Sequence, residues 1–264
     1  MKNIFTLFMS LILILMVTPK VYAPVGNPIT ITILYDNYVF GEGLEADWGF
    51  SCIIEGTEKT ILFDTGTKSD ILFRNINKLK VNPEGVELVA ISHNHGDHTG
   101  GLFSFLKENN EVTVYLPASF PDEFFRRVEK AGSKAVAVDK PVEICKDVTL
   151  TGEMGDRIKE QSLILNTNKG LVVITGCAHP GILKIVKKAK EILNKKIYLV
   201  FGGFHLLQKS EGEVKEIINQ FKDMGVLQVG PTHCTGDQAI ELFKEAYGEN
   251  FVQMGVGRVI KIAD

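Results

Sequence analysis

The most informative segment of this chain is Ser92-His-Asn-His-Gly-Asp-His-Thr-Gly-Gly-Leu102. It places three imidazoles and one carboxylate within six residues, at His93, His95, Asp97 and His98. Such side chains are rarely buried unless they are paired or bind a metal, so the motif indicates a metal site. If the backbone is extended from 93 to 97, its period of two puts alternate residues on one side, and the turn into a following helix brings His98 inward.

This motif resembles the signature of the metallo-β-lactamase superfamily. Three later motifs resemble the branch that contains the dihydropterin ribofuranosyl-aminobenzene phosphate synthases: Thr175-Gly-Cys-Ala-His-Pro-Gly181, Gly202-Gly-Phe-His-Leu206 and Pro231-Thr-His-Cys-Thr-Gly236. The resemblance runs from about Ile29 to the end of the chain. It implies an α/β fold, a four-layer αβ/βα sandwich of mixed sheets with flanking helices, and two metal ions at one edge. Such a fold does not determine the reaction.

The composition is that of an ordinary globular protein. The chain has 264 residues, of which 45% are hydrophobic and 23% charged, enough for one substantial core. The formal net charge of -3 and the lack of a Lys/Arg run give no general attraction to nucleic acid. We therefore expect a small-molecule substrate and no nucleic-acid partner, while the oligomeric state stays open.

Residues 1–23 have the pattern of an export signal peptide. Lys2 precedes the apolar run from Ile4 to Val17, and Val21-Tyr-Ala23 offers a cleavage site of small residues after Ala23. We predict export to the periplasm or the extracellular space, and one metallo-β-lactamase-like domain over residues 24–264. The apolar run is shorter than the roughly twenty residues that span a bilayer, so no stable span is expected after cleavage. An uncleaved membrane anchor is the alternative.

Runs of β-branched and aromatic residues predict strands, and apolar residues at helical spacing predict helices. The expected strands are 29–35, 50–55, 60–64, 86–91, 112–116, 135–138, 143–151, 161–166, 170–176, 196–201 and 226–230, with a last pair within 254–262. The expected helices are 69–79, 101–107, one after Pro121, 182–193, 213–221 and 239–246. Thr235-Gly-Asp-Gln238 predicts a capping box for the last helix. We expect Trp48 to pack in the core, with an aromatic wall beside a pocket as the alternative.

The chain contains six histidines, and the three later ones, His179, His205 and His233, each follow an apolar strand within four residues. Ligands in α/β proteins gather beyond the carboxyl ends of strands, so these histidines are expected to converge. Many members of the superfamily carry a further ligand in a Pro-Gly-His turn, which this chain replaces with Gly152-Glu-Met-Gly-Asp-Arg157. His179 would take the place of that missing ligand.

The resemblance implies two groups of ligands. We assign His93, His95 and His179 to one ion, and Asp97, His98 and His233 to the other. Cys177 lies where most of the superfamily has a bridging aspartate and where one lactamase subclass has a cysteine ligand. A thiolate there favours zinc over manganese or magnesium, with iron also open; a buried thiol beside the site is the alternative.

Two further residues are expected to support this centre. By resemblance, Asp64 holds the metal loop from behind the ligands. Cys234 is expected to contact the ligands rather than the metal, although an oxidising compartment would also permit a disulfide with Cys177. We expect Cys177 to be reduced and close to the metal.

These residues predict a metal-dependent hydrolase that uses two divalent ions and activated water on an ester, amide or phosphoester. Asp97 would orient the water, and His205 would donate to a developing oxyanion or a phosphate. The branch resemblance gives a metal-dependent transferase as the alternative, against which export argues because such pterin substrates are cytosolic. A second alternative is a single iron that supports thiol oxidation, or metal binding without catalysis.

Overall fold

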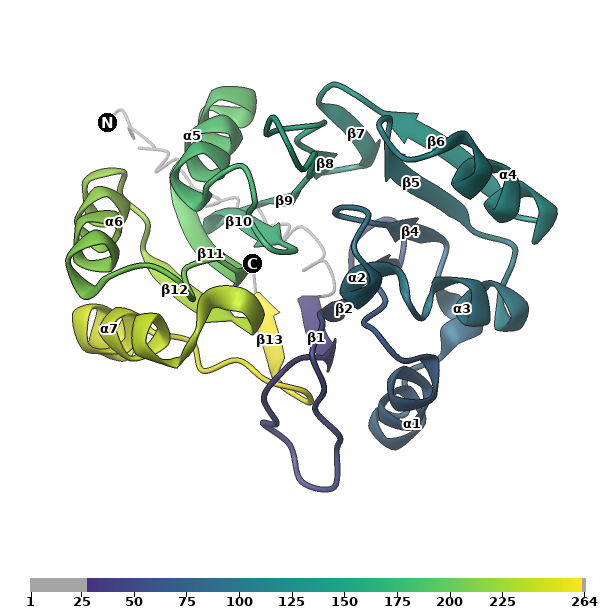
Figure 1. The fold of residues 1–264 in the computed structure, drawn as a ribbon, viewed down its shortest axis with the longest axis horizontal. Coiled ribbons are helices and arrows are strands. Elements are labelled where there is room, and N and C mark those ends of the chain that lie inside the picture. Colours follow the sequence, from purple (N-terminus) through teal and green to yellow (C-terminus); the bar gives the residue numbers. More distant parts are fainter. Residues whose placement is uncertain (1–27, 263–264) are drawn as a thin grey trace, which may run out of the picture.

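Residues 28–262 are described by a computed structural model, in which two β-sheets pack face to face between outer layers of helices (Figure 1). The seven-stranded sheet contains, in spatial order, β13 (Val259–Ile262), β1 (Ile29–Tyr35), β2 (Ser51–Glu55), β3 (Ile61–Phe63), β4 (Leu88–Ala90), β5 (Thr113–Pro117) and β6 (Lys134–Val138). The six-stranded sheet contains β12 (Gln228–Thr232), β11 (Ile197–Gly203), β10 (Gly170–Thr175), β9 (Leu163–Thr167), β8 (Val148–Leu150) and β7 (Val142–Cys145).

Helices cover the outer face of each sheet. On the seven-stranded sheet lie α1 (Ser69–Leu79), α3 (Leu102–Glu108) and α4 (Asp122–Lys130), and on the six-stranded sheet lie α5 (Ile182–Leu193), α6 (Glu211–Asp223) and α7 (Asp237–Tyr247). A short helix, α2 (Gly96–Thr99), sits at the edge between the two sheets, and 3₁₀ turns span Pro83–Gly85, His233–Thr235 and Gly248–Asn250. The predicted four-layer α/β sandwich is confirmed.

The layers follow from the alternation of side chains along each strand. In β10, Val172 and Ile174 enter the core between the sheets, while Leu171 and Val173 pack against the helices outside. The same alternation in β3 directs Phe63 inward. Because both faces of these strands are buried, they read as continuous apolar runs in the sequence.

Both sheets are mixed, and their parallel parts position the site. β3, β4, β5 and β6 pair in parallel, as do β10, β11 and β12, while the remaining neighbours are antiparallel. Parallel strands end at a common edge of their sheet, so the loops after β3, β4, β10, β11 and β12 meet at one edge of the sandwich.

Three details differ from the sequence-based expectations. Residues 143–151 form the hairpin of β7 and β8 instead of one strand, because Asp147 takes a left-handed turn with φ 62°. The expected pair within 254–262 reduces to β13, with Val256 making only an isolated bridge to Val39. The predicted capping box at Thr235 is wrong, since Gly236 is the N-cap of α7 and the Thr235 hydroxyl donates to the Thr232 carbonyl.

The predicted export signal, residues 1–23, lies outside the described residues. Within residues 28–262, no helix has the length and apolar character needed to cross a lipid bilayer.

The core between the sheets should dominate stability. Phe201 of β11 is fully buried there, so Phe201→Ala should lower the free energy of unfolding by about 3–5 kcal/mol, measured by urea denaturation. Leu227→Ala is the matched control, because the Leu227 side chain is 49% exposed. Equal losses in the two variants would contradict the two-sheet core.

Candidate metal centre

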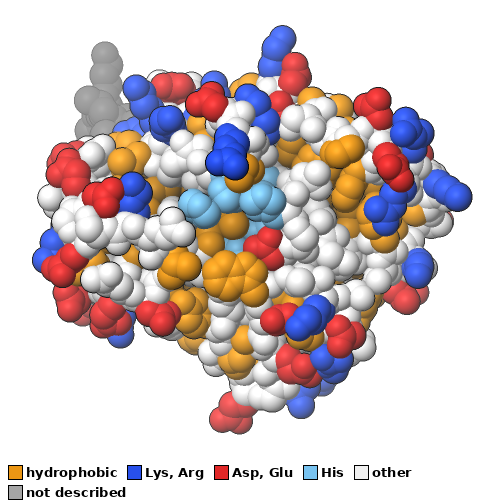
Figure 2. All heavy atoms as spheres, viewed as in Figure 1, with side chains coloured by type: hydrophobic (Ala, Val, Ile, Leu, Met, Phe, Trp, Pro, Cys, Tyr) orange, Lys and Arg blue, Asp and Glu red, His pale blue; other side chains and the backbone are white. Residues whose placement is uncertain are grey.

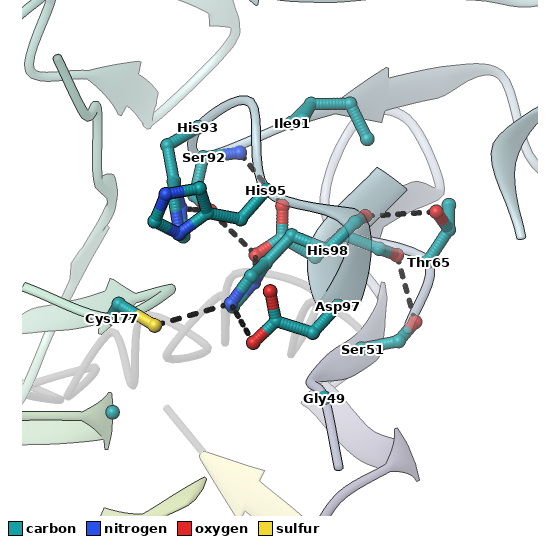
Figure 3. Close-up of polar contacts among 12 residues, drawn as sticks. Gly49, Ser51, Thr65, Ile91, Ser92, His93, His95, Asp97, His98 and Cys177 are labelled. Atoms are coloured by element: carbon teal, nitrogen blue, oxygen red, sulfur yellow. Dashed lines mark hydrogen bonds and ion pairs between the residues drawn. The ribbon is translucent and has the colours of Figure 1, made fainter. Parts of the chain in front are cut away.

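The histidine loop connects β4 to α2 at the edge of the sandwich. We expected an extended backbone from 93 to 97, and this is wrong for the second half of the loop. His95 is the N-cap of α2, which begins at Gly96. A helical turn, not the strand period, therefore brings Asp97 and His98 towards His93 (Figure 3).

All six histidines converge at this edge. His93, His95 and His98 come from the loop after β4, and the others follow β10, β11 and β12. Figure 2 shows histidine side chains gathered as one patch at the centre of the face, with acidic and apolar side chains beside it. The convergence beyond strand ends that the sequence indicated is present.

One set of donors is His93, His95 and His179, whose ligand atoms all lie within 4.8 Å of one another. His93 Nε2 and His95 Nδ1 are 3.0 Å apart, and the His179 ring centroid is 4.8 Å and 4.9 Å from theirs. The buried Nε2 of His179 has no hydrogen-bond partner. A cation among the three rings would satisfy this orphaned nitrogen, so the group fits a metal.

A second set is Asp97, His98, Cys177 and His233. Asp97 Oδ2 lies 3.5 Å from His98 Nε2 and 3.3 Å from His233 Nε2. Cys177 Sγ lies 3.3 Å and 3.4 Å from the same two nitrogens. The two sets adjoin, since the His93 and His98 ring centroids are 4.3 Å apart. This donor set of nitrogen, sulfur and one carboxylate is of the kind that binds zinc.

Asp64 orients the rings of the histidine loop. It is fully buried, its Oδ1 accepts from the Ser92 amide at 2.7 Å, and its Oδ2 accepts from the Ser92 hydroxyl and His98 Nδ1, each at 2.7 Å. The Ser92 hydroxyl lies 2.9 Å from His93 Nδ1. With their Nδ1 atoms engaged, His93 and His98 present Nε2 to the two donor sets. Gly176 permits this packing, because a Cβ there would lie 2.1 Å from the Ser92 hydroxyl.

Asn37 orients the ring of His233, a role that no sequence pattern indicated. Its Oδ1 lies 2.9 Å from His233 Nδ1, and its Nδ2 donates to the His233 carbonyl at 3.3 Å. The adjacent Asp36 is buried and accepts from the Thr232 hydroxyl at 2.8 Å. Burial raises the pKa of Asp36 to about 7. These contacts tie β1 of one sheet to β12 of the other beside the site.

Glu160 holds the loop that carries Cys177 and His179. Its fully enclosed carboxylate accepts from the backbone amides of Cys177, Ala178 and His179 at 2.9, 2.8 and 2.8 Å. The left-handed backbone of Ala178, with φ 61°, turns the successive amide N–H groups towards one point. A concave group of backbone amides of this kind, called a nest, binds an anion. Burial raises the pKa of Glu160 to about 7. No sequence pattern marked this residue, because the contact is tertiary.

The charges at the second donor set are complementary. Burial opposes a charge on His98, but Asp64 and Asp97 outweigh it and raise its pKa to about 10. Burial also opposes ionisation of Asp97, yet hydrogen bonds from His233 and His98 hold the pKa of its carboxyl well below the usual range. The site thus carries a carboxylate that attracts a cation, and a metal bound here would replace the proton on His98 Nε2.

Trp48 lies at the site and not in the core, so our expectation of core packing is wrong. Its side chain is 49% exposed, its Nε1 donates to Asp97 Oδ2 at 2.9 Å, and its ring centroid is 5.1 Å from that of His233. The alternative, an aromatic wall beside a pocket, describes its position. The Gly-rich loop from 37 to 49 therefore contributes both Asn37 and Trp48 to the site.

His205 lies beside the donor sets. Its ring centroid is 4.3 Å from that of His179, and the neighbouring Cys234 sulfur, as an acceptor for the ring N–H, raises the pKa of His205. Two cavities flank it. One of about 290 Å³ is lined by Trp48, His205, Leu207, Gln208, Lys209 and Cys234. The other, of about 320 Å³, is mainly apolar and lies between the start of α5 and the loop after β11.

Comparisons with known proteins agree with this geometry. Residues 49–176 match the family model of the metallo-beta-lactamase superfamily. A protein of Methanocaldococcus jannaschii, the 7,8-dihydropterin-6-methyl-4-(beta-D-ribofuranosyl)-aminobenzene-5'-phosphate synthase, is 32% identical over 81% of this chain and 89% of its own length.

Solved structures give the same result. A structure described as a metal-dependent hydrolase of the beta-lactamase superfamily has a TM-score of 0.77 and 30% identity, covering 89% of this chain and all of the other. The metallo-beta-lactamase fold protein YhfI of Bacillus subtilis has a TM-score of 0.67 at 16% identity, with 89% and 100% covered. The second likeness supports the fold alone.

Asp64→Asn should weaken metal binding about 10- to 100-fold, because an amide must point its NH₂ at a hydrogen-bond donor, either the Ser92 amide or His98 Nδ1. Zinc affinity would be measured by competition with a chromogenic chelator. Asp70→Asn, on the exposed side of α1, is the control. Unchanged zinc affinity in Asp64→Asn would show that the ring orientation does not depend on this carboxylate.

Proposed function

Since this chain belongs to the metallo-β-lactamase superfamily, we propose that it is a hydrolase that depends on two divalent metal ions, zinc by preference, and acts on an ester, amide or phosphoester of a small molecule. The observation that carries this proposal is the pair of adjoining donor sets next to two cavities and the His205 imidazole, which belongs to neither of these two sets. His93, His95 and His179 would hold one ion. Asp97, His98 and His233 would hold the other, with Cys177 as a further ligand.

When bound, such ions polarise a carbonyl or phosphoryl oxygen and lower the pKa of a coordinated water towards neutrality. The protein supplies orientation. Asp97 is ionised and fixed by Trp48 Nε1, so its carboxylate can accept a hydrogen bond from the attacking water. His205 carries a proton more readily than a free imidazole because of Cys234, and it can donate that proton to the developing oxyanion.

The cavities support a small substrate. Their volumes of about 290 and 320 Å³ are at the lower end of the range for small-molecule sites, roughly 300–1,000 Å³. Trp48 and Leu207 give the first cavity an apolar wall, and Lys209 lines both. A small ligand with an apolar part and an anionic group suits this lining better than a polymer does.

We also propose, from the sequence pattern of residues 1–23, that the protein is exported.

A metal-dependent transferase is the second candidate, and the 32% identity with the Methanocaldococcus jannaschii synthase favours it. The name of that relative describes a product with a 5'-phosphate, and this chain aligns with 89% of its length. A transferase would leave generic esters and phosphodiesters intact and would need a specific phosphorylated acceptor.

The two candidates separate in a substrate screen with chromogenic esters and phosphodiesters. We expect turnover that stops with a chelator and returns with zinc. Asp97→Ala should abolish both turnover and one bound ion, while His205→Ala, loaded with two equivalents of zinc, should keep both ions and lose rate about 100-fold or more. Metal content would be measured by mass spectrometry of the same samples.

Asp70→Asn again serves as the control, because the Asp70 carboxylate pairs with Arg74 on the surface. Full activity in Asp97→Ala would contradict the metal-centred mechanism. Absence of turnover over the whole panel, with the two ions bound, would favour the transferase.

A further inference from the structure

A third set of metal-ligand atoms lies beside the two that the proposed function uses. It consists of Cys177 Sγ, Cys234 Sγ and a ring nitrogen of His205, all within 4.8 Å of one another. Both thiols are reduced, and they are buried, with 4% and 5% exposure. Cys234 Sγ also lies 3.5 Å from the Cys177 carbonyl, which holds the two cysteine loops against each other.

The backbone around this set is held in an unusual conformation. Ala178, His205 and His233, with φ of 61°, 54° and 52°, are non-glycine residues in the left-handed region, and each adjoins or belongs to the set. Such conformations are unfavourable for a residue with a side chain, and they persist where the surrounding structure enforces them, often at ligand sites. Gly203 allows the close approach, because a Cβ there would lie 2.7 Å from Cys234 Sγ.

The set is accessible from solvent. His205 and Cys234 both line the cavity of about 290 Å³, and the His205 side chain is exposed. A small cation can therefore reach His205 and the Cys234 sulfur through the opening beside Trp48 and Leu207.

The chemistry of the donors selects the cation. Two thiolates and one imidazole form a soft set that favours zinc, cadmium or copper(I) over magnesium, calcium or manganese. Cys177 Sγ is also in contact with His98 Nε2 at 3.3 Å and His233 Nε2 at 3.4 Å, so this sulfur belongs to two donor sets at once. A thiolate has enough lone pairs to bridge two ions.

We propose that Cys177, His205 and Cys234 form a third metal site, for a thiophilic divalent cation, which shares the Cys177 sulfur with the Asp97, His98 and His233 set. Binding requires both sulfurs as thiolates, so any proton that either thiol still carries is released to solvent as the cation binds. An ion bound here coordinates a ring nitrogen of His205, which the proposed mechanism uses as a proton donor. Excess zinc or cadmium therefore inhibits the enzyme. The site itself does not depend on whether the reaction is hydrolysis or transfer.

The test counts bound cadmium, which prefers thiolates and gives a sulfur-to-metal absorption band in the ultraviolet. Reduced full-length protein is equilibrated with excess Cd²⁺, desalted and analysed by mass spectrometry. The wild type should bind three ions per chain, and Cys234→Ser should bind two and lose part of the absorption band. Cys145→Ser, which alters a buried thiol of β7 outside the site, should bind three.

A second variant keeps the test decisive if Cys234→Ser fails to fold. His205→Asn changes an exposed side chain and should also bind one ion fewer than the wild type. Equal cadmium counts in the wild type and both site variants would overturn the third site. A wild type with two ions and variants with one would support the third site while contradicting the two-ion centre of the proposed function, so the two failures are distinguishable.

Discussion

The buried carboxylate of Asp64 is the contact on which the arrangement of the site depends. Asp64 directly follows β3. Its carboxylate accepts hydrogen bonds from the backbone amide and the hydroxyl of Ser92, after β4, and from His98 Nδ1 in α2. One side chain therefore fixes the start of the histidine loop, its turn into a helix and the direction in which two imidazoles present Nε2. A buried carboxylate is costly unless its oxygens are fully hydrogen-bonded, and here the loop geometry provides those bonds.

Glu160 and the Asp36–Asn37 pair play the same part for the loops that follow strands of the six-stranded sheet. Glu160 gathers three consecutive amides of the loop after β10, and Asn37 fixes His233 after β12. Each is an acceptor from outside the loop that it holds. The donors consequently keep their positions through packing and hydrogen bonds, as a preorganised centre requires, and do not rely on the metal alone.

The resemblance to the metallo-β-lactamase superfamily implied the four layers. The sequence itself predicted most elements and the convergence of the histidines, because apolar alternation and an apolar strand followed by a histidine are local signals. It did not find Glu160, Asn37 or Asp36, whose roles arise from contacts between segments far apart in the chain. The prediction that Trp48 packs in the core was wrong, because a single tryptophan at the end of a glycine-rich loop is more often buried than exposed. The prediction of an extended backbone from 93 to 97 was wrong beyond His95, because a helix begins at Gly96. The ligand assignments themselves remain predictions that the geometry supports.

Anomalous X-ray diffraction at the zinc edge, on crystals loaded with two equivalents of zinc, tests the account most directly. We predict two peaks per chain, one among His93, His95 and His179 and one among Asp97, His98, Cys177 and His233. A single peak, or peaks away from these two sets, would contradict the dinuclear centre on which the proposed reaction depends.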